Sequence, residues 1–250
     1  MKPMSDTPYS TEFFGARSAE TFSSARVVVP LVVDLIKPKS VVDFGCGQGA
    51  WLRVFREQGV PTLQGYDGSY VDRNKLLVDQ SEFTDANLEA AMTVDRNYDL
   101  AVSLEVAEHL RTKRSRNFVR LLASAAPVVL FSAAIPGQGG TSHINEQWPE
   151  FWQELFAEFG YRRFDLFRAQ IWRNPQVEWW YRQNLYLFAH EKAPNYQAIV
   201  DANETENGSS IATELEILSD HTLGRMKSLR GVLSLVIPAL NRAIKNKFID

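Results

Sequence analysis

Apolar stretches rich in β-branched residues alternate along the chain with longer segments of helical periodicity. This alternation is typical of a parallel sheet covered by helices on both faces. The apolar stretches predict four strands, at Ser40–Phe44, Thr62–Asp67, Tyr98–Leu104 and Val128–Ser132. The helical spacing, interrupted by prolines and glycines, predicts four helices, at Ser18–Ile36, Ala50–Gln58, Thr112–Ala123 and Glu146–Phe159.

The pattern changes after Gly160. Two further strands are predicted at Arg162–Arg168 and Asn184–His190, on either side of the aromatic stretch Trp172–Tyr181. Two strands that follow each other in this way close a parallel sheet with an antiparallel hairpin. We therefore predict an α/β fold with a doubly wound, mostly parallel sheet.

The last quarter of the chain differs from this domain in composition. We expect residues 1–192 to form the α/β domain, the polar residues 193–211 to form a linker, and residues 212–250 to form an amphipathic helical tail. Within the tail, Thr222–Phe248 combines apolar residues at helical spacing with six basic residues. Such a stripe needs a partner, either protein (the same domain or a second copy in a homo-oligomer) or an anionic membrane surface.

Charge and cysteine content narrow the classes of partner and compartment. The 250 residues carry a formal net charge of -3, so no basic field favours nucleic acid as a partner. Cys46 is the single cysteine, which excludes an intramolecular disulfide. The N-terminus lacks the apolar core of a signal peptide, and apolar runs such as Val27–Ile36 are too short to span a bilayer. We expect a cytoplasmic protein.

A glycine-rich turn joins the first predicted strand to the second predicted helix. Its residues, Asp43-Phe44-Gly45-Cys46-Gly47-Gln48-Gly49-Ala50, allow a ligand to approach the backbone and the helix N-terminus. Gly45, Gly47 and Ala50 also satisfy the dinucleotide pattern, with Asp67 as the ribose acid, so a dehydrogenase is an alternative. Against it, the carboxylate of Asp43 would repel a pyrophosphate, whereas it would attract a cofactor that carries an ammonium group.

These residues resemble the class I S-adenosylmethionine methyltransferases, whose first motif places an acid two residues before a G-x-G-x-G turn. The resemblance continues at Gly65–Gly68, at Phe83–Leu88 and at Tyr98–Leu110, the last being similar to ubiquinone-pathway O-methyltransferases. It implies a Rossmann-like, seven-stranded fold and the cofactor S-adenosylmethionine. The residues that it assigns to the cofactor are Asp43, Gly45, Gly47, Gly49, Asp67 and Asp85.

A cluster of acids and histidines follows the fourth predicted strand. If the chain is helical there, Glu105, Glu108 and His109 share one face, and His143 lies in a neighbouring loop. Two carboxylates and two imidazoles can hold a divalent ion such as Mg, Mn or Zn, and the set is similar to the metal site of the small-RNA 2′-O-methyltransferases. Alternatively, Glu108 pairs with Arg111 while His109 caps the helix or acts as a base.

The candidate catalytic residues are His143, His109 and Glu105, because the methyl donor is already activated and the protein must align a nucleophile and remove its proton. The segments Asp67–Arg73 and His143–Pro149 look like a bacterial methyltransferase group associated with cell-surface carbohydrate assembly. We therefore expect methyl transfer to a hydroxyl of a carbohydrate or another small molecule. An RNA ribose 2′-O-methyltransferase and a non-catalytic binding protein on the same fold are the alternatives.

Overall fold

A computed structural model describes residues 11–94 and 97–206 of the chain. Its centre is a seven-stranded sheet of order β3-β2-β1-β4-β5-β7-β6, in which β5–β7 and β7–β6 are the antiparallel pairs. The strands are β1 (Ser40–Phe44), β2 (Thr62–Asp67), β3 (Phe83–Asp85), β4 (Leu100–Leu104), β5 (Val128–Ser132), β6 (Tyr161–Phe164) and β7 (Tyr186–His190). The Rossmann-like fold predicted from the sequence, with its antiparallel end, is confirmed.

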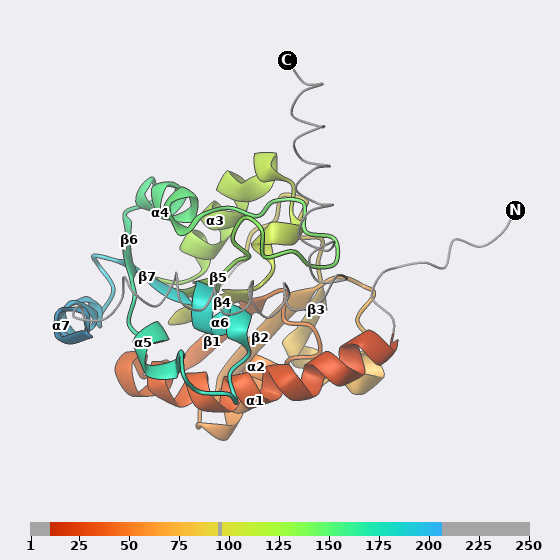
Figure 1. Cartoon of the computed structure of the whole chain (residues 1–250). Helices are drawn as coiled ribbons and strands as arrows, with labels where there is room; N and C mark the ends of the chain where they lie inside the picture. The colour runs from red at the N-terminus through yellow and green to blue at the C-terminus, as the bar shows by residue number, and fades with distance from the viewer. Residues whose placement is uncertain (1–10, 95–96, 207–250) are drawn as a thin grey trace, which may run out of the picture.

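Helices cover both faces of this sheet. The helices are α1 (Thr11–Ile36), α2 (Ala50–Glu57), α3 (Ser115–Ala125), α4 (Pro149–Ala157), α5 (Arg168–Ile171), α6 (Trp179–Asn184) and α7 (Tyr196–Glu206). Short 3-10 turns lie at η1 (Arg73–Lys75), η2 (Gln80–Glu82), η3 (Ala107–His109) and η4 (Thr112–Arg114). Figure 1 shows α1 and α2 below the sheet and α3 and α4 above it.

The sheet separates two apolar cores. Successive side chains of a strand point to opposite faces. Leu100, Val102 and Leu104 of β4 therefore pack in the core between the sheet and helices α1 and α2. Ala101, which lies between Leu100 and Val102 in the strand, packs in the core between the sheet and helices α3 and α4. A strand buried on both faces reads as a nearly continuous apolar run, which explains why the limits of β1 and β5 follow directly from the sequence.

Several elements differ from the prediction. The predicted strand Arg162–Arg168 is β6, which ends at Phe164, and the chain between β6 and β7 contains α5 and α6, which were not predicted. Strand β3 is absent from the prediction, because two of its three residues, Thr84 and Asp85, are polar and exposed at the sheet edge. The predicted linker 193–211 is wrong over residues 196–206, which form α7. The composition of this segment is polar, yet one side of α7 is buried: Ile199 is fully buried and Asn203 is 8% exposed.

The predicted amphipathic tail lies outside the described residues and remains a prediction. Among residues 11–94 and 97–206, no helix combines the length and apolar character needed to cross a membrane.

Candidate functional site

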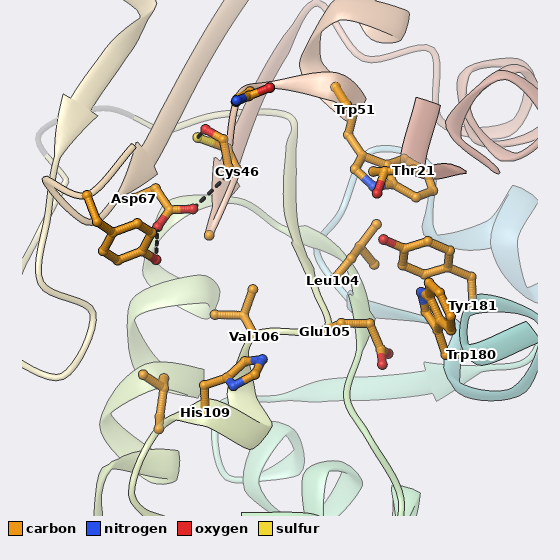
Figure 2. Close-up of a pocket in the computed structure, with 16 residues that line it drawn as sticks. Thr21, Cys46, Trp51, Asp67, Leu104, Glu105, Val106, His109, Trp180 and Tyr181 are labelled. Atoms are coloured by element: carbon orange, nitrogen blue, oxygen red, sulfur yellow. Dashed lines mark hydrogen bonds between the residues drawn. The ribbon is translucent and has the colours of Figure 1, made fainter. Parts of the chain in front are cut away.

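A cavity of about 260 Å³ opens where β1, β2 and β4 end. Open α/β sheets bind ligands at this carboxyl edge. Figure 2 shows Asp67 and Cys46 on one side of the cavity, Trp51 and Tyr181 on the other, and His109 below. The lining residues come from α1, α2, α6 and the loops after the three strands: Thr21, Gly45, Cys46, Gly47, Gln48, Ala50, Trp51, Asp67, Tyr70, Leu104, Glu105, Val106, His109, Leu110, Trp180 and Tyr181.

The glycine turn forms the upper wall of this cavity. Gly45 has a φ of 87°, and a Cβ there would lie 2.3 Å from Cγ2 of Val106, so only glycine fits this close approach to the loop after β4. Gly49 has a φ of 85° and is the N-cap of α2. Between them, the backbone N–H of Gly47 donates to Oδ2 of Asp67 at 2.6 Å. At its glycines the turn therefore presents bare backbone to a ligand.

Two buried carboxyl groups lie at the base of the turn. Asp43 is 2% exposed, and its Oδ2 has no hydrogen-bond partner among the described residues. Burial, with a further contribution from the charge of Asp67, raises the pKa of Asp43 well above its ordinary value. Burial also raises the pKa of Asp67, against the opposing effect of donors from Tyr70, Gly47 and Gly68. An unpaired buried carboxyl group is costly unless a cationic ligand compensates it.

Glu105 leaves β4 in a left-handed conformation, with a φ of 55°. Helical geometry begins only at Ala107, so the carboxylate of Glu105 departs from the helix face predicted for it. It accepts hydrogen bonds from Nε2 of Gln138 at 3.0 Å and from Nδ2 of Asn184 at 3.1 Å. These two amides, one from the loop after β5 and one from the end of α6, fix the carboxylate against the wall of the cavity.

Glu108, His109 and His143 form a separate cluster, whose potential ligand atoms lie within 4.8 Å of one another. The imidazole rings of the two histidines are 4.9 Å apart between centroids, and Nε2 of His143 is 4.0 Å from Oε1 of Glu108. Glu108 is completely buried, and neither carboxylate oxygen has a hydrogen-bond partner among the described residues. Burial, reinforced by the charge of Glu105, raises the pKa of Glu108 well above its ordinary value. The structure thus brings three of the four predicted metal ligands together, and Glu105 is not in this group.

Each histidine of the cluster has a hydrogen-bond acceptor near its Nδ1 atom. Nδ1 of His109 lies 3.3 Å from the carbonyl oxygen of Ser142, and Nδ1 of His143 lies 3.4 Å from Oε1 of Glu146. A carbonyl or a carboxylate only accepts, so each Nδ1 carries the hydrogen in the neutral ring. In that ring Nε2 is the unprotonated nitrogen, the form that a base or a metal ligand requires.

The alternative pairing of Glu108 with Arg111 is wrong. Arg111 bonds Glu89 instead, through its backbone N–H at 2.6 Å and its Nε at 2.8 Å. The physical reason is burial, because Glu108 points inward while Arg111 remains on the surface.

A family model described as "Methyltransferase domain" matches residues 22–184. The chain belongs to the methyltransferase family. With this match and the fold, it is a class I S-adenosylmethionine-dependent methyltransferase. A comparison with curated proteins gives no match.

Solved methyltransferase structures share the fold. The sugar N-methyltransferase KedS8 from a Streptoalloteichus species has a TM-score of 0.56 at 15% identity, over 76% of this chain and 98% of its own. CalS10, an amino pentose methyltransferase from Micromonospora echinaspora with bound S-adenosylmethionine, has a TM-score of 0.54 at 12% identity, over 74% and 99%. The methyltransferase domain of bacterial CtHen1 has a TM-score of 0.50 at 18% identity, over 68% and 98%. At these identities, the likeness shows the fold alone.

The residues of this methyltransferase fit the cofactor of its class. The unpaired Oδ2 of Asp43 suits an ammonium group, although Asp43 lies behind the cavity wall and does not line it. Asp67 lines the cavity and suits a ribose diol. Asp85 neighbours Asp67 in the sheet register but forms an ion pair with Arg73 at 2.8 Å and does not line the cavity. The assignment of Asp85 to the cofactor remains a prediction.

Several site residues were not predicted individually. Gln138 and Asn184 hold Glu105, and Glu146 holds His143. The sequence signal that could have identified Asn184 is the polar pair Gln183-Asn184 after the aromatic stretch. Polar side chains buried in an apolar core need hydrogen-bond partners, so such a pair indicates a polar site. Two members of that aromatic stretch, Trp180 and Tyr181, line the cavity.

Proposed function

We propose that this methyltransferase transfers the methyl group of S-adenosylmethionine to a hydroxyl of a carbohydrate or another small molecule. The observation that carries the proposal is the cluster of Glu108, His109 and His143 beside the cavity, with His109 in its wall. A hydroxyl oxygen is a weak nucleophile unless its proton is removed as it attacks the methyl carbon, whereas the nitrogen of a neutral amine can attack before it loses a proton. A pair of histidines with unprotonated Nε2 atoms therefore favours a hydroxyl acceptor over an amine.

The other ionisable groups around the cavity are poorly suited to act as the base. Burial raises the pKa of Tyr181 to about 12, so its phenol stays neutral at physiological pH. Burial also raises the pKa of the Cys46 thiol, and the charges of Asp43 and Asp67 raise it further. Glu105 has its carboxylate engaged by two amides. These facts leave His109 and His143 as the bases of the proposal.

S-adenosylmethionine supplies a methyl group on a positively charged sulfur, which departs with the electron pair of the broken S–C bond. The protein has to orient the acceptor oxygen and take its proton. In the proposal, Asp67 and the glycine turn position the nucleoside, Asp43 compensates the ammonium group, and Nε2 of a cluster histidine accepts the hydroxyl proton as the new O–C bond forms.

A divalent cation is the second version of the same site. Glu108, His109 and His143 would hold it, the two histidines through Nε2. The contacts of their Nδ1 atoms with Ser142 and Glu146 match the outer-sphere hydrogen bonds that ligating histidines usually make. A bound cation would lower the pKa of an acceptor hydroxyl. Carboxylate and imidazole donors suit Mn or Zn, and Mg with a larger share of water ligands.

The acceptor class follows from the remaining wall of the cavity. Trp180 and Tyr181 offer aromatic surface opposite the nucleoside side, and sugar rings and aromatic rings both stack on such side chains. The named neighbours KedS8 and CalS10 act on sugars, which supports a carbohydrate acceptor. The RNA 2′-hydroxyl remains the alternative because the Glu108 cluster is similar to the site of that enzyme group.

The proposal is tested by incubating the full chain with S-adenosylmethionine and panels of sugar nucleotides, small hydroxyl compounds and short RNAs, and by measuring S-adenosylhomocysteine. We expect turnover with a hydroxylated small molecule and its loss in His143→Asn. Turnover with RNA alone would establish the alternative function. Cofactor binding without turnover on any panel would support a non-catalytic binding protein.

Chelation separates the two versions of the site. If a cation takes part, a chelator abolishes turnover and added Mg, Mn or Zn restores it. If a histidine acts directly as the base, turnover persists in the chelator while His143→Asn remains inactive.

A further inference from the structure

The loop between β5 and α4 contains a carboxylate with two sets of contacts. Glu146 accepts hydrogen bonds from the backbone N–H groups of Gly137 at 2.8 Å and Gly139 at 2.7 Å. The oxygen that bonds Gly139, Oε1, also lies 3.4 Å from Nδ1 of His143. The side chains of His143 and Glu146 are only 11% and 9% exposed, so water competes weakly for these contacts.

The geometry points to Glu146 as a positioning residue with two roles. It fixes the tautomer of His143, and it holds the conformation of the loop segment Gly137–Gly139. A carboxylate has no hydrogen to donate when ionised, so its contact with Nδ1 selects the ring with hydrogen on Nδ1. Nε2 of that ring is unprotonated and faces Glu108, 4.0 Å away. The consequence for catalysis rests on the proposed function of His143 as base or ligand.

The two sets of contacts depend on each other because they share one side chain. Gly137 and Gly139 both have positive φ values, 93° and 68°, and their N–H groups converge on the two oxygens of Glu146. Opening this segment would remove both donors from the carboxylate and free it to rotate away from His143. The conformation of the segment Gly137–Gly139 and the hydrogen on Nδ1 of His143 are therefore coupled through Glu146.

Gly140 adds an independent constraint on the same ring. A Cβ at this position would lie 2.3 Å from Nε2 and 2.4 Å from Cε1 of His143. The ring thus packs directly on backbone that carries no side chain. Glu146 determines which nitrogen is protonated, and Gly140 leaves the ring the space to stand in that orientation.

The test measures the tautomer in the full chain labelled with ¹⁵N-histidine, without cofactor or acceptor. Long-range ¹H–¹⁵N spectra at about pH 8, above the ordinary histidine pKa of about 6.5, distinguish a protonated Nδ1 from a protonated Nε2. The chain has four histidines, and His143→Asn assigns the signal of interest. We expect hydrogen on Nδ1 in the wild type and a shift toward hydrogen on Nε2 in Glu146→Ala.

Glu146→Gln provides the variant of matched size. Its amide retains one acceptor and replaces the other with a donor, so it cannot accept from both glycines, and we expect faster proteolysis between Gly137 and Gly140. Turnover, once an acceptor is known, should fall roughly 10–100-fold in both variants, the usual effect of removing a group that orients a histidine, with cofactor affinity unchanged. Glu150→Gln, at the exposed start of α4, is the control and should match the wild type.

A wild-type His143 protonated on Nε2, or the same tautomer in the wild type and in folded Glu146→Ala and Glu146→Gln, overturns the inference. If Glu146→Ala does not fold, the tautomer and proteolysis of Glu146→Gln decide. Failure of the proposed function would be seen separately, as a correct tautomer in a protein that transfers no methyl group.

Discussion

The phenolic hydroxyl of Tyr70 donates a hydrogen bond to Oδ1 of Asp67, the carboxylate proposed to bind the ribose. The ring of Tyr70 lies directly over Gly68, where a Cβ would approach Cε1 to 2.2 Å. Tyr70 is nevertheless 48% exposed, so it can leave this place without opening a core. The hydroxyl occupies an acceptor that a ribose diol would use.

Replacing Tyr70 by Phe should therefore strengthen the binding of S-adenosylmethionine, because the ribose no longer displaces an internal donor. The gain should be about 0.5–1.5 kcal/mol, the net value of a typical hydrogen bond, measured by calorimetry. Asp67→Ala is the opposite control and should weaken binding by about 1.5–3 kcal/mol. A clear loss of affinity in Tyr70→Phe would mean that the hydroxyl itself contacts the cofactor.

Asp43 should make the stability of the ligand-free protein depend on pH. Its raised pKa means that the folded protein keeps this proton at pH values where the unfolded chain, with an ordinary pKa of about 4, has lost it. The native state then binds more protons than the unfolded state, so the free energy of unfolding decreases as pH rises through this range. Asp43→Asn cannot titrate, and its free energy of unfolding should decrease less between about pH 5 and 8 in urea titrations.

The cofactor supplies the matched control for this experiment. A bound ammonium group compensates the charge of Asp43, so saturating S-adenosylmethionine should stabilise the wild type more than Asp43→Asn. Equal pH dependence of the two proteins without ligand would show that the buried carboxyl of Asp43 is not destabilising.

Gly140→Ala should lower turnover while leaving cofactor binding intact. Its φ lies outside the left-handed range, so alanine is tolerated by the backbone, but the new Cβ collides with the His143 ring. A displacement of about 1 Å in a catalytic group can cost on the order of 100-fold in rate. Gly59→Ala, at the end of α2, is the matched control, because its φ of 86° strains the chain while a Cβ there meets no atom within 4 Å. It should chiefly lower the melting temperature.

Deleting Gly224–Asp250 should leave the affinity for S-adenosylmethionine unchanged, because the cavity is built from α1, α2, α6 and the strand ends. The amphipathic pattern of the deleted segment predicts a loss elsewhere, in self-association or in binding to anionic liposomes. Sedimentation and liposome flotation distinguish the two. Unfolding of the truncated chain would instead make the tail part of the domain core.

The sequence was informative where side chains alone determine structure. Strands β1 and β5 are buried along their whole length and bounded by breakers, so their apolar composition defines them. The conformation of Glu105 was not predictable in this way, because positive φ is rare outside glycine, and the side chains of Gln138 and Asn184 that hold its carboxylate are distant in sequence. The prediction that Glu105 shares a helix face with Glu108 and His109 failed because the 3-10 turn that contains Glu108 and His109 begins only at Ala107.

The order of strands at the end of the sheet has a consequence for synthesis of the protein. Strand β7 comes last along the chain, yet it lies inside the sheet, with β5 on one side and β6 on the other. A nascent chain that ends before Tyr186 leaves the edge of β5 unpaired and gives β6 no neighbour. Exposed strand edges of this kind invite pairing with other chains. The last two strand pairs of the sheet can therefore form only after synthesis has passed His190.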